Sequence, residues 1–474
     1  MKILIGLVVA IGIVFFSFTN WRRAIKAVFL IVVFEGALRK WVLPQASDLI
    51  YFLKDAVLLG AYIQYYGFAL IKGKGGGKNT AINILVFLSV LWGAFQVFNP
   101  SLGSLVIGLF GFKSYFFYIP MMWMLPDLFP TKDEFYRFIR SHLVLAIPVG
   151  LIGAIQFVSP IDSPINSYAW GEELGVAWIY VGNSIRARIT GTFSYVNNYS
   201  AYLLICFGLL VPLLSKPQTP RWRYASLAAM LLVIVNLLMT GSRGPVFASV
   251  LFLIGFLLAR TLKQPSSTFA LVRRFIPAAI VLTLLIFIFF RPAVNAFLQR
   301  TTSNNDISSR LQNEFSQPVE FFQYKELDGY GTGATQKGAP ALRRAFDLPP
   351  GERIATYYED EMGRVVLEIG PIGFLLWYGL RLSLIVALWD VFRRSKDPFL
   401  AQMALAAFLI HLINIRSQLV FHHTFALYYW FLSSFIFIIP RLEQAENWYR
   451  GLTAPVQRLP QPMPAPAHLL TPTE

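Results

Sequence analysis

Residues 237–250 read LLMTGSRGPVFASV and join two long apolar runs, 224–240 and 245–262. Only the four residues Gly241 to Gly244, which include a serine and an arginine, separate the end of one run from the start of the next. Each run has the length that crosses the hydrocarbon core of a bilayer, about 17–25 residues. The stretch therefore predicts two membrane-spanning helices joined by a tight turn, and that turn carries Arg243.

The composition extends this interpretation to the whole chain. Of the 474 residues, 56% are hydrophobic and 14% are charged, whereas soluble globular proteins carry about 25% charged residues. Such a chain has too little polar surface to cover a soluble body. We predict an all-α polytopic membrane protein with about 12–13 transmembrane helices. The predicted spans are 2–18, 27–44, 49–71, 80–98, 108–128, 139–158, 197–215, 224–240, 245–262, 275–290, 365–390, 399–416 and 424–440.

The basic residues indicate how these spans are oriented. The net charge of +16 raises the question of a nucleic-acid partner. Lysines and arginines, however, follow every second predicted span, from the first to the last. The positive-inside rule accounts for that alternation, so we expect no nucleic acid. It predicts an N-terminus outside and a C-terminus in the cytoplasm.

The remaining connections predict one integral membrane domain over residues 1–450. Two loops on the predicted outer face are long, about 159–196 and 291–364. Short amphipathic pieces in the second loop predict helices that lie at the membrane interface. The tail 451–474 is rich in proline and is predicted to be a disordered cytoplasmic segment.

Several cations lie on the predicted outer side, where the positive-inside rule gives no reason for them. A guanidinium group matches phosphate oxygens bidentately. A Gly-rich turn that opens a helix also presents free N–H groups to an anion. On the residues alone, a lipid-linked diphosphate at the outer leaflet and simple interfacial anchoring are about equally favoured. The cations are Arg39, Lys40, Lys113, Arg186, Arg188, Arg243 and Arg416.

Four motifs in order favour the diphosphate. They are RITGTFSYVNNYSAYLL, LLMTGSRGPVFASV, GYGTG within the second long loop, and LEIGPIGFLLW. Together they resemble the bacterial O-antigen ligase and O-antigen polymerase superfamily. The resemblance implies a C-type glycosyltransferase fold at the outer face of the bacterial inner membrane. It implies transfer of a sugar chain from an undecaprenyl diphosphate carrier to an acceptor hydroxyl, with Arg188 and Arg243 on the diphosphate and no metal or other cofactor.

One position departs from the ligase pattern. In the ligases a histidine, the proposed general base, precedes an E-x-G-x-x-G element, which is here Glu368, Gly370 and Gly373. The matching position in this chain is Glu359. The resemblance therefore implies that Glu359 or the nearby Glu361 takes the role of the base, and it favours a polymerase over a ligase. A carboxylate beside apolar walls has a raised pKa that suits a base at neutral pH.

Two other classes of protein fit part of the pattern. A flippase or transporter of lipid-linked sugars would place basic groups along a midplane path and would often contain two repeated halves, whereas this sequence shows no internal repeat. A non-catalytic scaffold of a polysaccharide export complex would not need Arg188, Arg243 and Glu359 to converge. The expected partners are an undecaprenyl-diphosphate-linked glycan, the lipid bilayer, and chain-length regulators or export proteins of polysaccharide synthesis.

Overall fold

The computed structural model describes residues 2–453 apart from a few gaps. The gaps are 73–78, 170–174, 182–183, most of 264–289, 304–306 and 326. The predicted span 275–290 therefore lies largely outside the described residues, as does the predicted disordered tail from residue 454 onward.

The described part of the chain is mostly helical with two short strands, and the predicted all-α polytopic class is confirmed. Eight helical stretches among these residues are long and apolar enough to cross a membrane, and two shorter apolar helices accompany them. The eight are Thr80–Val97, Leu105–Leu128, Lys132–Val158, Val196–Ser215, Pro220–Met239, Arg243–Lys263, Glu361–Arg394 and His423–Trp448.

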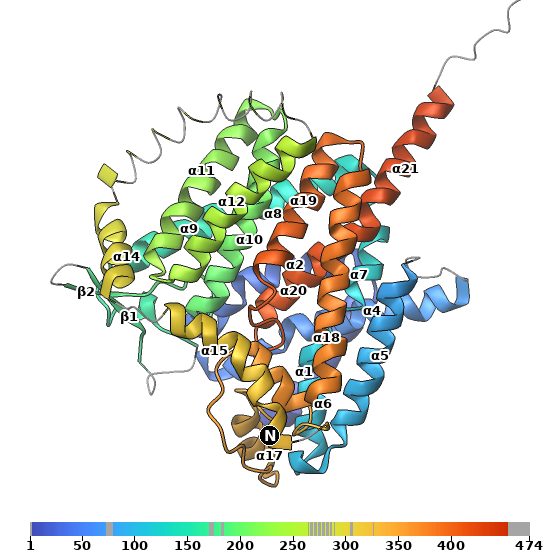
Figure 1. Cartoon of the computed structure of the whole chain (residues 1–474), viewed down its shortest axis with the longest axis vertical. Coiled ribbons are helices and arrows are strands. Elements are labelled where there is room, and N and C mark those ends of the chain that lie inside the picture. The colour runs from blue at the N-terminus through green and yellow to red at the C-terminus, as the bar shows by residue number, and fades with distance from the viewer. Residues whose placement is uncertain are drawn as a thin grey trace, which may run out of the picture.

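The helices of residues 2–158 are spread across the molecule, with α9 on one side and α5 on the other (Figure 1). Its α-helices are α1 (Lys2–Phe18), α2 (Trp21–Ala37), α3 (Ser47–Tyr51), α4 (Leu53–Lys72), α5 (Thr80–Val97), α6 (Leu105–Phe116), α7 (Met121–Met124), α8 (Lys132–Val144) and α9 (Ala146–Val158). The predicted span 27–44 is not one continuous α-helix, because α2 passes into a π-helical turn at Leu38–Val42. That turn buries Arg39 and Lys40 within the protein.

The second half adds a helical bundle and a hairpin. The strands β1 (Trp178–Val181) and β2 (Ser184–Ala187) pair antiparallel. The helices are α10 (Val196–Ser215), α11 (Pro220–Met239), α12 (Arg243–Lys263), α14 (Arg291–Ser303), α15 (Ile307–Glu320), α16 (Phe322–Lys325), α17 (Ala339–Phe346), α18 (Glu361–Arg394), α19 (Pro398–Ile413), α20 (His423–Ser433) and α21 (Phe435–Thr453).

Helix α18 lies at the centre and packs against both α5 and α19. Figure 1 shows α9 to α12 on one side of it, α5 on the other, and α6 near its lower end. Helices α15 and α17, from the long loop 291–364, gather at one end of the molecule, while α21 extends from the opposite end. The loop predicted to face outward and the end of α21 predicted to face the cytoplasm are thus at opposite ends.

Helix α18 is broken at Gly370, and the break explains how the GYGTG loop is attached. Gly370 has a φ of 66°, in the left-handed region, and Pro371 has no N–H to donate to the carbonyl oxygen of Leu367. The backbone N–H of Tyr330 donates to that oxygen instead, at 2.7 Å. The indole of Trp92 donates to the carbonyl oxygen of Ile369 at 2.8 Å. The loop therefore docks where α18 has an unused backbone acceptor.

Candidate functional site

The turn between α11 and α12 has the tight geometry that the sequence predicts. Gly241 has a φ of 62°, which favours glycine over residues with a Cβ atom. A Cβ atom at this position would also lie only 2.7 Å from Ile179 of β1. The backbone N–H of Ser242 donates to Thr240 Oγ1 at 3.2 Å. Arg243 is the first residue of α12, where the helix dipole is positive.

Arg188 lies against this turn and connects two of the sequence motifs. Its Nε donates to the carbonyl oxygen of Thr240 at 2.9 Å, and its Nη2 lies 2.7 Å from Ser242 Oγ. The phenol of Tyr168 donates to the carbonyl oxygen of Arg188 at 2.8 Å. The structure therefore brings the guanidinium of Arg188 and the start of the helix that carries Arg243 to one place. Positive charge beside a helix N-terminus is the general arrangement of an anion site.

The loop that follows Arg188 is held by the two buried cations of the π-helical turn. Lys40 Nζ donates to Thr190 Oγ1 at 2.8 Å and to the carbonyl oxygen of Gly191 at 2.9 Å. Arg39 Nη1 donates to Ser194 Oγ at 3.1 Å. These contacts fix the TGTFS segment directly after Arg188.

Arg186 and Lys113 each bond to a partner outside the 240–242 turn. Arg186 Nη1 donates to the carbonyl oxygen of Val158, the last residue of α9, at 3.0 Å. A cation at a helix C-terminus interacts favourably with the dipole. Lys113 on α6 forms an ion pair of 2.5 Å with Asp55 on α4. Both residues therefore have a structural partner within the protein.

Lys113 belongs to a network of buried charges that the sequence interpretation missed. Asp55 accepts a further hydrogen bond of 2.6 Å from Tyr118, and Glu35 on α2 pairs with Lys54 on α4 at 2.7 Å. The available signal was the presence of charged residues inside predicted spans, since charges at membrane depth usually pair with one another or line a cavity. Their pairing between different helices could not be read from one sequence.

The two candidate bases, Glu359 and Glu361, lie in different environments. Glu361 is buried, and its Oε1 pairs with Arg381 Nη1 at 2.8 Å in an ion pair that is fully shielded from solvent. Its Oε2 accepts the backbone N–H of Val420 at 3.0 Å. Glu359 is exposed, and its Oε2 lies 3.3 Å from the phenol of Tyr357. Of the two, Glu359 has the carboxylate that a substrate can reach.

Arg416 and Glu359 are connected through the loop between α19 and α20. The side chain of Gln418 in that loop donates to the carbonyl oxygen of Glu359 at 3.0 Å. Arg416 lies in the same loop, with its guanidinium carbon 5.7 Å from the ring centre of Phe315 on α15. The loop therefore carries Arg416 two residues before Gln418, the residue that is bonded to the backbone of Glu359.

A second missed residue is Arg364, one turn into α18. Arg364 is 2% exposed, and its Nη2 donates to the carbonyl oxygen of Thr335 at 2.6 Å. Glu368, one turn further along α18, accepts the backbone N–H of Thr335 at 2.9 Å and its hydroxyl at 2.8 Å. The two side chains clamp the end of the GYGTG loop. Their spacing of four residues was the only sequence signal, because residues at i and i+4 share one helix face.

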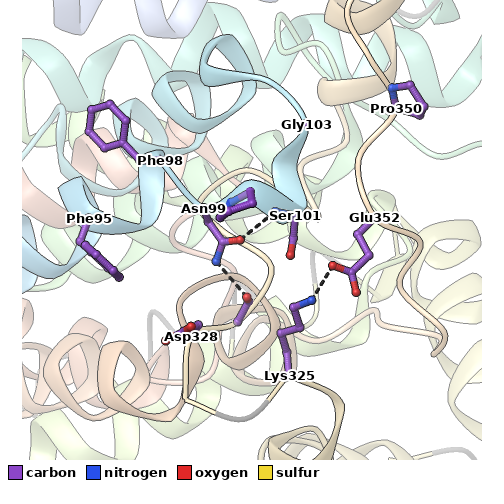
Figure 2. A pocket seen from close by; sticks show the side chains of 11 residues that line it. Phe95, Phe98, Asn99, Ser101, Gly103, Lys325, Asp328, Pro350 and Glu352 are labelled. Carbon is purple, nitrogen blue, oxygen red and sulfur yellow. Dashed lines mark hydrogen bonds and ion pairs between the residues drawn. The ribbon is translucent and has the colours of Figure 1, made fainter.

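A cavity of about 580 Å³ lies beside the GYGTG loop (Figure 2). Asn99 donates to the carbonyl oxygen of Gly329 at 3.0 Å, and Lys325 pairs with Glu352 at 2.5 Å. Hydrogen bonds from Lys325 and Ser101 hold the pKa of Glu352 below its usual value. The polar walls thus come from three segments that are distant in sequence.

The chemistry of the described side chains also bears on metals. Within the part of the chain that the structure describes, no group of three or more His, Cys, Asp and Glu side chains is arranged to hold a metal ion.

The comparisons with known proteins agree with the motifs. Residues 199–378 match the family model described as O-antigen ligase, a segment that includes the 240–242 turn, the GYGTG loop and the break in α18. No curated protein matches the chain. The chain therefore carries, over residues 199–378, a domain of the O-antigen ligase family.

Proposed function

We propose that this protein is a membrane glycosyltransferase that polymerises undecaprenyl-diphosphate-linked oligosaccharide repeat units at the outer face of the bacterial inner membrane. It would act in the synthesis of a surface polysaccharide or exopolysaccharide. The observation that carries the proposal is the contact between Arg188 and the turn that begins α12 with Arg243. Arg188 and Arg243, which the resemblance assigns to the diphosphate, belong to separate segments, and Arg188 contacts the turn that directly precedes Arg243.

This arrangement suits the departure of a diphosphate. The bond between the anomeric carbon and the phosphate oxygen breaks, and its electron pair goes to the diphosphate. Fixed cations and helix N–H groups stabilise the developing charge without reorganising during the reaction. Arg188 is held by Thr240 and Ser242, so its guanidinium is already oriented before a substrate binds.

Glu359 is the proposed general base. The acceptor hydroxyl oxygen attacks the anomeric carbon, and the carboxylate of Glu359 takes the hydroxyl proton. The exposure of Glu359 supports this assignment, whereas both carboxylate oxygens of Glu361 are occupied inside the protein. We assign Glu361 to holding the start of α18 in place, which positions Glu359 two residues earlier.

Different roles are proposed for the three other candidate cations, which are Arg416, Arg186 and Lys113. Arg416 lies in the loop that is bonded to the backbone of Glu359, so we propose that it contacts the diphosphate or an adjacent sugar. Arg186 and Lys113 remain candidates for the diphosphate, but their contacts with Val158 and Asp55 favour a supporting role.

The alternatives are an O-antigen ligase that uses a lipid A-core acceptor and a flippase of lipid-linked sugars. The glutamate at the position of the ligase histidine supports the polymerase. The test is the length of polysaccharide on gels from a deletion strain that expresses wild type, Arg243→Ala or Glu359→Gln, with protein levels checked by blot. Loss of long chains with single repeat units remaining supports the polymerase. Long chains that stay on the carrier indicate the ligase, and wild-type polymer from both variants rejects the catalytic assignment.

A matched control is available at the far end of α18. Arg394 is largely exposed and pairs with Asp390 one turn earlier, so Arg394→Ala removes an arginine without touching the candidate site. We expect polysaccharide of wild-type length from this variant.

A further inference from the structure

We propose that the cavity beside the GYGTG loop binds sugar residues of the membrane-borne glycan, an inference that rests on the proposed function. The cavity measures about 580 Å³, within the range of about 300–1,000 Å³ that is usual for ligand sites. Figure 2 shows Phe95 and Phe98 on one side of it and the polar side chains on the other.

The lining is suited to a sugar in two respects. A pyranose ring has an apolar C–H face and an edge of hydroxyl groups. Phe95 and Phe98 offer aromatic rings that are 63% and 73% exposed, and such rings bury a large apolar area. Asn99, Lys325 and Glu352 offer hydrogen-bond donors and acceptors in the same cavity. A few placed polar groups within an apolar lining are typical of specific small-ligand sites.

The charges of the lining argue against the diphosphate as the occupant. The ionisable side chains that line the cavity are one cation, Lys325, and two anions, Asp328 and Glu352. Lys325 is already paired with Glu352 at 2.5 Å. An anion would meet a net negative lining, whereas a neutral polyhydroxyl group meets no such opposition.

The position of the cavity fits a ligand that is anchored in the bilayer. Exposed apolar side chains run along one face of α5 and end at the cavity; they are Ile84, Phe87, Leu91, Phe95 and Phe98. This spacing of three to four residues is that of a lipid-facing stripe on a helix. The polar residues Asn99 and Ser101 follow immediately. The cavity thus lies where a lipid-facing surface meets a polar one, as a glycolipid requires.

The cavity is next to the GYGTG motif but separate from Arg188 and Arg243. Its wall includes Gly329, whose neighbour Tyr330 binds the broken turn of α18. Figure 1 shows α5 on the opposite side of the molecule from β1 and β2, the hairpin next to Arg188. The site therefore serves the glycan and not the diphosphate, and that glycan can belong to the donor or to the acceptor.

The test uses the full-length protein in lipid nanodiscs and a defined probe. The probe is the repeat-unit oligosaccharide released by mild acid from the carrier lipid of the deletion strain, and its binding is measured by saturation-transfer NMR. We expect Phe98→Ala to weaken binding by about fivefold to tenfold. The matched control is Phe87→Ala, on the same stripe of α5 with 64% exposure but outside the cavity, which should bind within about twofold of wild type.

Two results would overturn the proposal. One is wild-type binding by both Phe98→Ala and Phe95→Ala. The other is an equal loss in Phe98→Ala and Phe87→Ala, because the effect would then come from the lipid-facing stripe and not from the cavity. In a reconstituted reaction, a raised KM for only the donor or only the acceptor would identify which glycan occupies the site.

Different experimental results would reject the proposed function and the sugar-binding cavity. Arg243→Ala should bind the free oligosaccharide like wild type. It should not join carrier-linked repeat units into longer chains. Polymer formation by Arg243→Ala would reject the catalytic assignment whatever the result at Phe98. If Arg243→Ala makes no polymer, as expected, but Phe98→Ala binds the sugar like wild type, only the assignment of the cavity as a sugar site is rejected.

Discussion

The guanidinium of Arg188 is bonded to the turn that starts α12, with Nη2 2.7 Å from Ser242 Oγ and Nε 2.9 Å from the carbonyl oxygen of Thr240. The residue directly after the hairpin and the turn directly before α12, which come from separate motifs, are thus held as one unit. Because the contact is made through two different nitrogens, a single-point cation cannot reproduce it.

Arg188→Lys should therefore lose most polysaccharide polymerisation although the positive charge is kept. Lysine offers one compact ammonium group, which cannot reach both Thr240 and Ser242 in the same geometry. Gel analysis of polysaccharide in a complemented deletion strain measures the effect. Ser242→Ala should show a smaller loss, because it removes one hydrogen bond worth about 1 kcal/mol. Wild-type chain length from Arg188→Lys would contradict the importance of the bidentate contact.

Substitution in the buried pair of Glu361 and Arg381 should reduce folding, whereas substitution of Glu359 should reduce activity. Arg381→Met leaves the Glu361 carboxylate without its cation in a fully buried position, which costs about 3–5 kcal/mol. We expect a large drop in the amount of folded protein, measured by size-exclusion chromatography in detergent. Glu359→Gln should give normal amounts of folded protein and lose activity. A normal yield of Arg381→Met would show that the ion pair is not needed for folding.

The break in α18 supplies a prediction with a control in the same helix. Gly370→Ala places a Cβ atom 2.0 Å from the carbonyl oxygen of Leu327 and strains a φ of 66°. Strain of this kind costs of order 1–3 kcal/mol before the clash is added. Gly379→Ala meets no atom closer than 4.0 Å, and alanine in a helix is favoured over glycine by about 0.5–1 kcal/mol. Thermal unfolding in detergent should rank Gly370→Ala below wild type and Gly379→Ala at or above it.

The contact between Lys325 and Glu352 predicts a dependence on acid pH. Hydrogen bonds from Lys325 and Ser101 lower the pKa of Glu352 from its usual value of 4.5. A carboxyl group with a lowered pKa in the folded state contributes its stabilisation above the ordinary pKa and loses it as the pH falls through the folded-state pKa. Hydrogen exchange at the backbone N–H of Glu352, which donates to the carbonyl oxygen of Ser101 at 2.8 Å, should therefore stay protected from neutral pH down to 4.5 and lose protection at lower pH.

Glu352→Gln is the control for this pH dependence. Glutamine keeps a hydrogen-bond acceptor for Lys325 but does not titrate. The loss of protection below pH 4.5 should disappear in this variant. The same loss in the variant would mean that another group controls the protection of this N–H.

The sequence predicted the parts of the fold that depend on local pattern. Apolar length predicted the helices, and the tight turn predicted between two spans appears at 240–242 with Gly241 at positive φ. The motifs also placed Arg188 and Arg243 in one family pattern. The contact of Arg188 with Thr240, however, joins residues that are 52 positions apart, and nothing in a single sequence specifies such a pair.

The missed features all depend on tertiary contacts. Arg364 did not stand out in the sequence, because its importance comes from its contacts with Thr335. The pairing of Lys113 with Asp55 needs the relative positions of α4 and α6. The break at Gly370 had a local signal in Pro371, but only the structure shows that Tyr330 uses the freed acceptor.

The most direct test of the account is a reaction with purified components. Wild-type protein is reconstituted with the undecaprenyl-diphosphate-linked repeat unit alone, and products are separated by size while released undecaprenyl diphosphate is measured. The account predicts a ladder of longer chains with one diphosphate carrier released per bond formed, and neither product from Arg243→Ala. Movement of intact lipid-linked units across the bilayer, with no new glycosidic bond from wild type, would contradict it.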